Sequence, residues 1–126
     1  MSIPARQFQT QQVHFLRKDF TYADDGSTLN VGKVPAGSVI LKPVSGANVS
    51  TAFNAGTTNV LDIGTEADGD LFATDLALGS AAFVPCDEAV SFYVSSDTVI
   101  TATVDLTGTA ATTGVGQVVI AYIPNI

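Results

Sequence analysis

The chain has 126 residues, of which 13% are charged, and its formal net charge is −7. This length suits one domain with a proper core. An acidic chain is a poor partner for nucleic acid, which requires clustered Lys and Arg, and no apolar run approaches the ~20 residues of a membrane helix. We therefore expect neither nucleic acid nor a membrane as a partner.

The charge is divided unevenly along the chain. All five basic residues lie within the first 42 positions, together with three acids, whereas residues 43–126 contain nine acids and no base. Residues 1–12 are polar and rich in glutamine, without a sustained helical or strand period. They are predicted to be either a disordered tail or an extended N-terminal arm that becomes ordered on a neighbour. Residues 13–126 are predicted to form a single β-sandwich or jelly-roll domain.

The first part of this body has strand composition interrupted by turns. Strands are predicted within residues 13–22, at 29–31 and at 39–44, with a turn over 34–37. Pro43 lacks a backbone donor, so it is expected at an edge or a bulge.

Period-two alternation is clear in the next segments. It marks residues 47–53, residues 90–94 with Val90 facing inward, and residues 98–107, where Ile100 begins an inward-facing series. These patterns are typical of half-buried strands.

The last strand, residues 117–123, is apolar on both faces, so it is either central and covered on both sides or has an outer face that meets a partner. Only residues 71–78 have the apolar spacing of a helical turn. The chain is therefore predicted to be all-β, a jelly roll or β-sandwich of about eight or nine short antiparallel strands with an extended N-terminal arm.

One acidic cluster deserves comparison with calcium sites. It contains four carboxylates in nine residues, namely Asp62, Glu66, Asp68 and Asp70. Calcium prefers several oxygen ligands, but the order differs from an EF-hand loop, and Asp-Gly-Asp is also common in turns. A solvated loop is the favoured interpretation, and no metal site is predicted.

Nothing in the sequence indicates catalysis. His14 and Cys86 are the only residues of their types, and no nucleophile motif flanks either of them. Asp87 and Glu88 follow the cysteine and would raise the pKa of its thiol. We predict no enzyme activity, no catalytic residues and no cofactor. The single cysteine and the lack of a secretory signal at the N-terminus favour synthesis in a reducing cytoplasm.

Several short segments together resemble a known family. They are residues 34–40 (VPAGSVI), 51–54 (TAFN), 63–70 (IGTEADGD) and 114–124, which includes the apolar run 118–122. In these turn and strand patterns, over residues 34–124, the chain resembles small structural proteins of tailed bacteriophages. More specifically, it resembles the jelly-roll capsid cement, or decoration, proteins.

The resemblance implies a non-enzymatic virion protein, made in the host cytoplasm, that sits on the capsid exterior. It would bind the major capsid protein, cement neighbouring coat subunits and form a homo-oligomer, with a dimer favoured over a trimer. The residues expected at its interfaces are Ile3, Arg6, Phe8, Arg17 and Lys18 near the N-terminus, and Val119, Ala121, Ile123 and Ile126 at the other end.

A second hypothesis is a tail- or fibre-associated β-sandwich that recognises a host-surface glycan. Sugar-binding sites usually present aromatic side chains for stacking. The chain lacks Trp, and the aromatic residues that could be exposed are Tyr22, Phe53, Tyr93 and Tyr122. A substitution of Tyr93 or Tyr122 would test this alternative.

Overall fold

A computed structural model describes residues 12–124 of the chain, and this part contains ten β-strands and two short 3-10 helices. The elements are β1 (His14–Thr21), η1 (Tyr22–Asp24), β2 (Thr28–Val34), β3 (Ser38–Ile40), η2 (Lys42–Val44), β4 (Gly46–Thr51), β5 (Thr58–Thr65), β6 (Ala73–Ala77), β7 (Phe83–Pro85), β8 (Tyr93–Val94), β9 (Thr98–Thr107) and β10 (Val115–Ile123).

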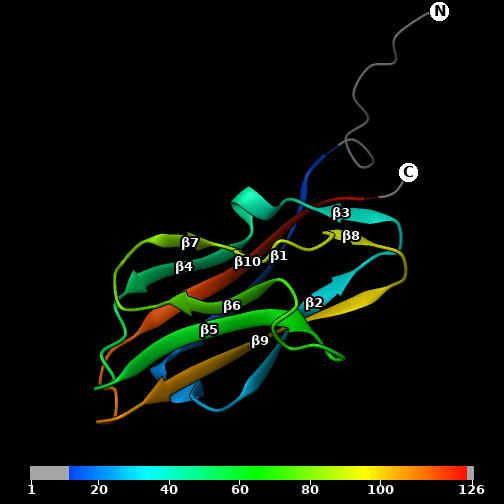
Figure 1. Cartoon of the computed structure of the whole chain (residues 1–126). Coiled ribbons are helices and arrows are strands. Elements are labelled where there is room, and N and C mark those ends of the chain that lie inside the picture. Colours follow the sequence, from blue (N-terminus) through cyan, green and yellow to red (C-terminus); the bar gives the residue numbers. More distant parts are fainter. Residues whose placement is uncertain (1–11, 125–126) are drawn as a thin grey trace, which may run out of the picture.

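These strands form two sheets, which face each other as two layers (Figure 1). The six-stranded sheet has the order β7-β4-β10-β3-β8, and β1 pairs with β10; the four-stranded sheet has the order β2-β9-β5-β6. Every pairing is antiparallel. The prediction of an all-β sandwich is therefore confirmed, with ten strands in place of eight or nine.

The core lies between the two sheets, where alternate side chains of the central strands meet. In β9, Ile100, Ala102 and Val104 are completely buried, as the alternation predicted. Val118 and Ile120 of β10 oppose them from the six-stranded sheet and are also completely buried. Burial of a large aliphatic side chain contributes about 1.5–3 kcal/mol, so these two strands anchor the fold.

The prediction of a helical turn over residues 71–78 is wrong. This segment contains β6, which pairs with β5 so that Leu76 lies opposite Leu61. The free edge of β5 provides backbone partners that a local apolar pattern does not reveal, and tertiary pairing therefore overrides the local signal. The strand β5 itself was not predicted.

Two other boundaries also differ from expectation. The strand predicted over residues 39–44 ends at Ile40, and Pro43 lies in η2, where a residue without a backbone donor is tolerated in the first turn. Within residues 90–94 only Tyr93–Val94 form a strand, and Val90, expected to face inward, is 40% exposed.

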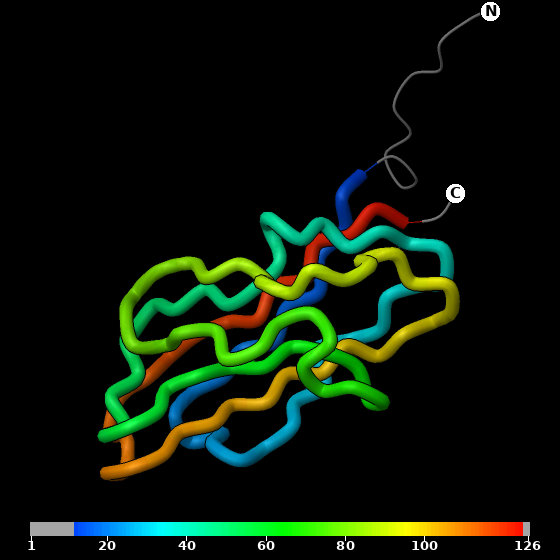
Figure 2. Tube along the Cα trace, viewed as in Figure 1, coloured from blue at the N-terminus to red at the C-terminus, as the bar shows by residue number. Residues whose placement is uncertain are grey.

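The end of the molecule that carries β3 and β8 also holds the start of β1 and the end of β10 (Figure 1). The connections between β5 and β6 and between β8 and β9 lie at this end as well (Figure 2). The predicted N-terminal arm, apart from Gln12, lies outside the described residues, as does Ile126. The division into arm and domain stays a prediction.

Candidate functional site

Three exposed apolar side chains lie side by side on the outer face of the six-stranded sheet. Val39 of β3 is directly opposite Tyr93 of β8 on one side and Ile123 of β10 on the other. Because directly opposed residues of antiparallel strands share a face, the three form a row across adjacent strands. Their exposed fractions are 43% for Val39, 55% for Tyr93 and 44% for Ile123.

The row continues onto β1, on the other edge of β10. Phe15 is opposite Ala121 and is 51% exposed, and Val13, two residues earlier in the chain, is also exposed. The guanidinium of Arg17 lies 5.7 Å from the centre of the Phe15 ring, a cation–π distance. We refer to Val13, Phe15, Val39, Tyr93 and Ile123 as the outer apolar row.

Farther along the same face, polar side chains follow the row. Asp19 of β1 lies opposite Gln117 of β10, and the Gln117 amide donates a hydrogen bond of 2.8 Å to the Asp19 carboxylate. Isolated exposed apolar residues are ordinary, but a contiguous patch with a polar border is typical of an interaction surface. The outer apolar row is therefore the best candidate for a protein-binding site.

The structure brings together only some of the predicted interface residues. Ile123 belongs to the outer apolar row, and Arg17 lies opposite Val119, which is partly exposed, on the same face. Lys18 lies opposite the inward-facing Val118 and is therefore on the other side of the sheet, although it is exposed at the edge strand.

Ala121 presents no surface of its own. Its side chain is completely buried, and its backbone N–H donates to the Ser45 hydroxyl while its carbonyl accepts from the Leu41 N–H. The segment around η2 thus packs against this part of β10. Ile3, Arg6, Phe8 and Ile126 lie outside the described residues.

The exposure of Phe15 and Val39 was not evident from the local sequence pattern. Phe15 lies between His14 and Leu16, and Val39 precedes Ile40, so neither position shows the apolar–polar contrast that reveals which face is buried. Their exposure follows from the pairing register with β10.

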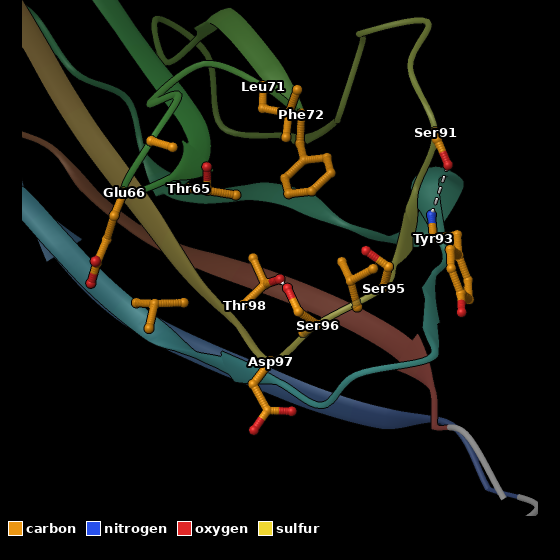
Figure 3. A pocket seen from close by; sticks show the side chains of 13 residues that line it. Thr65, Glu66, Leu71, Phe72, Ser91, Tyr93, Ser95, Ser96, Asp97 and Thr98 are labelled. Carbon is orange, nitrogen blue, oxygen red and sulfur yellow. Dashed lines mark hydrogen bonds between the residues drawn. The ribbon is translucent and has the colours of Figure 1, made fainter.

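An open pocket of about 420 Å³ lies at the same end of the molecule, where the β5–β6 connection approaches the β8–β9 connection (Figure 3). Glu66, Asp97, Phe72 and Tyr93 are among the residues that line it, and no Lys or Arg is. Serine and threonine hydroxyls supply much of the other polar lining, from Thr65, Ser91, Ser95, Ser96 and Thr98.

Tyr93 connects this pocket with the outer apolar row, because it belongs to both. In Figure 3, Tyr93 and Glu66 lie on opposite sides of the pocket, with the Phe72 ring between them. One Asp97 carboxylate oxygen accepts from the Ala36 N–H at 2.9 Å, which holds the β8–β9 connection in place.

The acidic cluster does not assemble a metal site. Among residues 12–124, no group of three or more His, Cys, Asp or Glu side chains is placed to hold a metal ion. The Asp62 carboxylate accepts from the Asp75 N–H at 2.7 Å instead. Hydrogen bonding with the Asp68 side chain, followed by desolvation and by the charge of Asp68, raises the pKa of Asp70. Glu66, Asp68 and Asp70 lie exposed in the connection between β5 and β6, whereas Asp62 belongs to β5.

His14 and Cys86 do not provide an activated nucleophile. The His14 ring packs against Tyr122 with centroids 5.6 Å apart. Cys86 is buried, and this burial, followed by the charge of Asp87, raises the pKa of its thiol to about 12. A neutral, inaccessible thiol has no nucleophilic role at physiological pH.

Comparison with known proteins gives no match to any family model and none to any curated protein. No helix in residues 12–124 has the length and apolarity needed to span a bilayer. The fold is similar to a chain in the capsid asymmetric unit of cyanophage Pam1, with a TM-score of 0.67 and 15% sequence identity over 99% of this chain and 93% of that one.

The fold is also similar to a chain in the acidic stable capsid structure of Helicobacter pylori bacteriophage KHP30. Here the TM-score is 0.54 and the identity 18%, over 90% of this chain and 89% of the other. At these identities the likeness is one of fold. The chain thus has an all-β sandwich fold that also occurs among chains of phage capsid structures.

Proposed function

We propose that this protein is a structural component of a phage virion that binds the outer capsid surface and cements neighbouring major coat subunits. The observation that carries the proposal is the contiguous outer apolar row on one face of a sandwich whose fold is similar to chains in two phage capsid structures. In this role the chain has no enzymatic activity and needs no cofactor.

A partner that covers the outer apolar row would gain binding free energy from the hydrophobic effect. Each of its large side chains is about half exposed, and covering apolar surface contributes about 25 cal/mol per Å². The rigid sheet fixes the row in one geometry, so little conformational entropy is lost on binding. Arg17, beside Phe15, adds a cation at the border of the patch.

A specific interface needs about 800 Å² from each partner, which five partly exposed side chains do not supply alone. Residues 1–12, with Ile3, Arg6 and Phe8, would add contact area on the shell. A homo-oligomer, with a dimer favoured over a trimer, would multiply the contacts of each copy through avidity.

The test is attachment of purified variants to capsids that lack the protein. Val39→Glu and Ile123→Glu each place a charge within the row and are expected to abolish attachment. Thr107→Glu, at an exposed position of β9 in the other sheet, is the matched control and should attach normally. Attachment of all three variants at wild-type levels would refute this surface as the capsid contact.

The copy number relative to the major coat protein distinguishes the wider alternatives. A simple ratio with hundreds of copies per virion supports a cement role over the whole shell. A handful of copies would favour a tail or vertex location, and absence from the virion would refute the proposal.

One observation favours the second candidate, a tail- or fibre-associated module that binds a host glycan. Tyr93 is exposed beside a pocket rich in hydroxyls, whereas Tyr122 is 8% exposed and packs on His14. Retention on a glycan array that is lost with Tyr93→Ala would support this function, and absence of any retention would eliminate it.

A further inference from the structure

We propose that residues 1–11 of the chain bind back onto their own copy, along the outer apolar row, with Arg6 in the acidic pocket. This inference concerns the free protein and does not depend on the proposed capsid role. It rests on the chemistry of the pocket, the continuity of the row and the length of the segment.

The pocket has the character of a site for a cationic side chain. Glu66 and Asp97 line it, no Lys or Arg does, and the Phe72 and Tyr93 rings offer aromatic surface. Guanidinium groups combine hydrogen bonds to carboxylates with stacking on aromatic rings. Lys33 lies opposite Val99, a pocket residue, in the β2–β9 pairing, but its own side chain is not part of the lining.

The N-terminal segment carries the complementary charge. Residues 1–11 contain Arg6 and no acid, whereas residues 43–126 contain nine acids and no base. The segment also contains Ile3 and Phe8, apolar side chains that suit a row of exposed apolar neighbours. The charge and apolar pattern of the segment therefore match those of the surface.

The segment is long enough to reach the pocket. It joins the described chain next to Val13, at the start of the row, and Tyr93 lies three strands away, across β10 and β3 to β8. Three strand spacings amount to about 14 Å. Seven residue steps separate Arg6 from Val13, and they span up to about 23 Å when the chain is extended.

Only a short stretch of chain connects the N-terminal segment to the domain. The segment is therefore expected to bind the pocket of its own copy and not the pocket of a second copy. A short flexible linker gives an effective concentration in the millimolar range, well above micromolar protein in solution. Self-binding would also cover the outer apolar row and Arg6 of the free protein, so that an external partner for the row must displace the segment.

Disulfide trapping in the full-length chain tests this inference. Gln7→Cys is combined with Ser96→Cys at the pocket, and the matched control combines Gln7→Cys with Ala110→Cys, an exposed position beyond the far end of β9. The ten residues of β9 separate the two ends by about 30 Å. Cys86 is buried and does not compete.

Under mild oxidation of dilute protein, we expect the pocket pair to form an intramolecular disulfide about ten-fold or more faster than the control pair. Adding Arg6→Gln or Glu66→Gln should slow the pocket pair, as should high salt, which screens exposed charges. Non-reducing electrophoresis with mass determination separates monomeric from dimeric products.

Equal rates for the two pairs would overturn the inference, and so would a pocket-pair rate that does not respond to Arg6→Gln. A dimeric product that predominates in dilute solution would also overturn it, because the segment would then occupy a second copy.

Discussion

Substitution of Gly64 by alanine should destabilise the loop that forms one wall of the pocket. Gly64 lies near the end of β5, where the following loop folds back over the strand. A methyl group at Gly64 would overlap the carbonyl oxygen of Asp68 and lie 2.5 Å from the carbonyl carbon of Gly69. Both are backbone atoms, so the loop itself must move.

The loss of stability follows from the backbone hydrogen bonds that a movement of the loop would break. The Asp68 carbonyl accepts from the Thr65 N–H at 2.8 Å and from the Leu71 N–H at 3.2 Å. Each backbone hydrogen bond contributes about 1 kcal/mol net, and forced overpacking typically costs about 1–3 kcal/mol. We expect a loss of about 1–3 kcal/mol in the free energy of unfolding, or a fall in Tm of roughly 3–5 °C per kcal/mol.

Gly69→Ala, in the same loop, is the matched control. A methyl group there meets no atom within 4 Å, so reduced entropy of the unfolded chain should leave stability unchanged or raise it by up to about 1 kcal/mol. Denaturant unfolding, monitored by circular dichroism, measures the free energy of unfolding of both variants. Equal effects of the two substitutions, or a more damaging Gly69→Ala, would refute the reasoning.

Three further outcomes are expected. Cys86 is buried and the pKa of its thiol is raised to about 12, so it should not react with a disulfide reagent at pH 8 in the folded protein. In denaturant, the reagent should detect one thiol per chain. Reaction of the folded protein at the rate of a free thiol would contradict the burial of Cys86. Asp68 raises the pKa of Asp70 in the folded protein, so protonation of Asp70 stabilises the folded state. This stabilisation is fully present below the ordinary pKa of 3.8 and is lost as the pH rises through the folded-state pKa. Asp70→Asn should therefore be at least as stable as wild type at pH 7 and lose this advantage near pH 3. Urea unfolding at both pH values measures this. A variant less stable than wild type at pH 7 would count against repulsion between the Asp68 and Asp70 carboxylates. Ile120→Ala, at a completely buried position, should lower the free energy of unfolding by about 2–5 kcal/mol. Ile123→Ala, at an exposed position, should lower it by well under half as much. Thermal melts that rank the two variants in the reverse order would show that the core is misassigned.

The candidate surface was only partly predictable from the sequence. The apolar outer side of the last strand was recognised, and Ile123 indeed lies in the row, while Ala121 is buried beside η2. The gathering of Phe15, Val39 and Tyr93 around Ile123 depends on which strands flank β10. Neighbours within a sheet that are far apart in the chain leave no local sequence pattern.

The sequence by itself determined the fold class and the buried face of β9. A side-chain period of two in residues 98–107 can bury Ile100, Ala102 and Val104 only in an extended strand, and the frequent turn residues leave no room for crossover helices. These features are local, because they depend on the geometry of a few consecutive residues.

Only the tertiary structure decided that residues 73–77 form a strand, that β10 is central and that an acidic pocket borders the apolar row. Each depends on hydrogen bonds or packing between segments distant in the chain. The segment of β6 has apolar spacing that suits either a helical turn or a strand, and the free edge of β5 selects the strand, since paired backbone groups in the folded state outweigh a weak local preference.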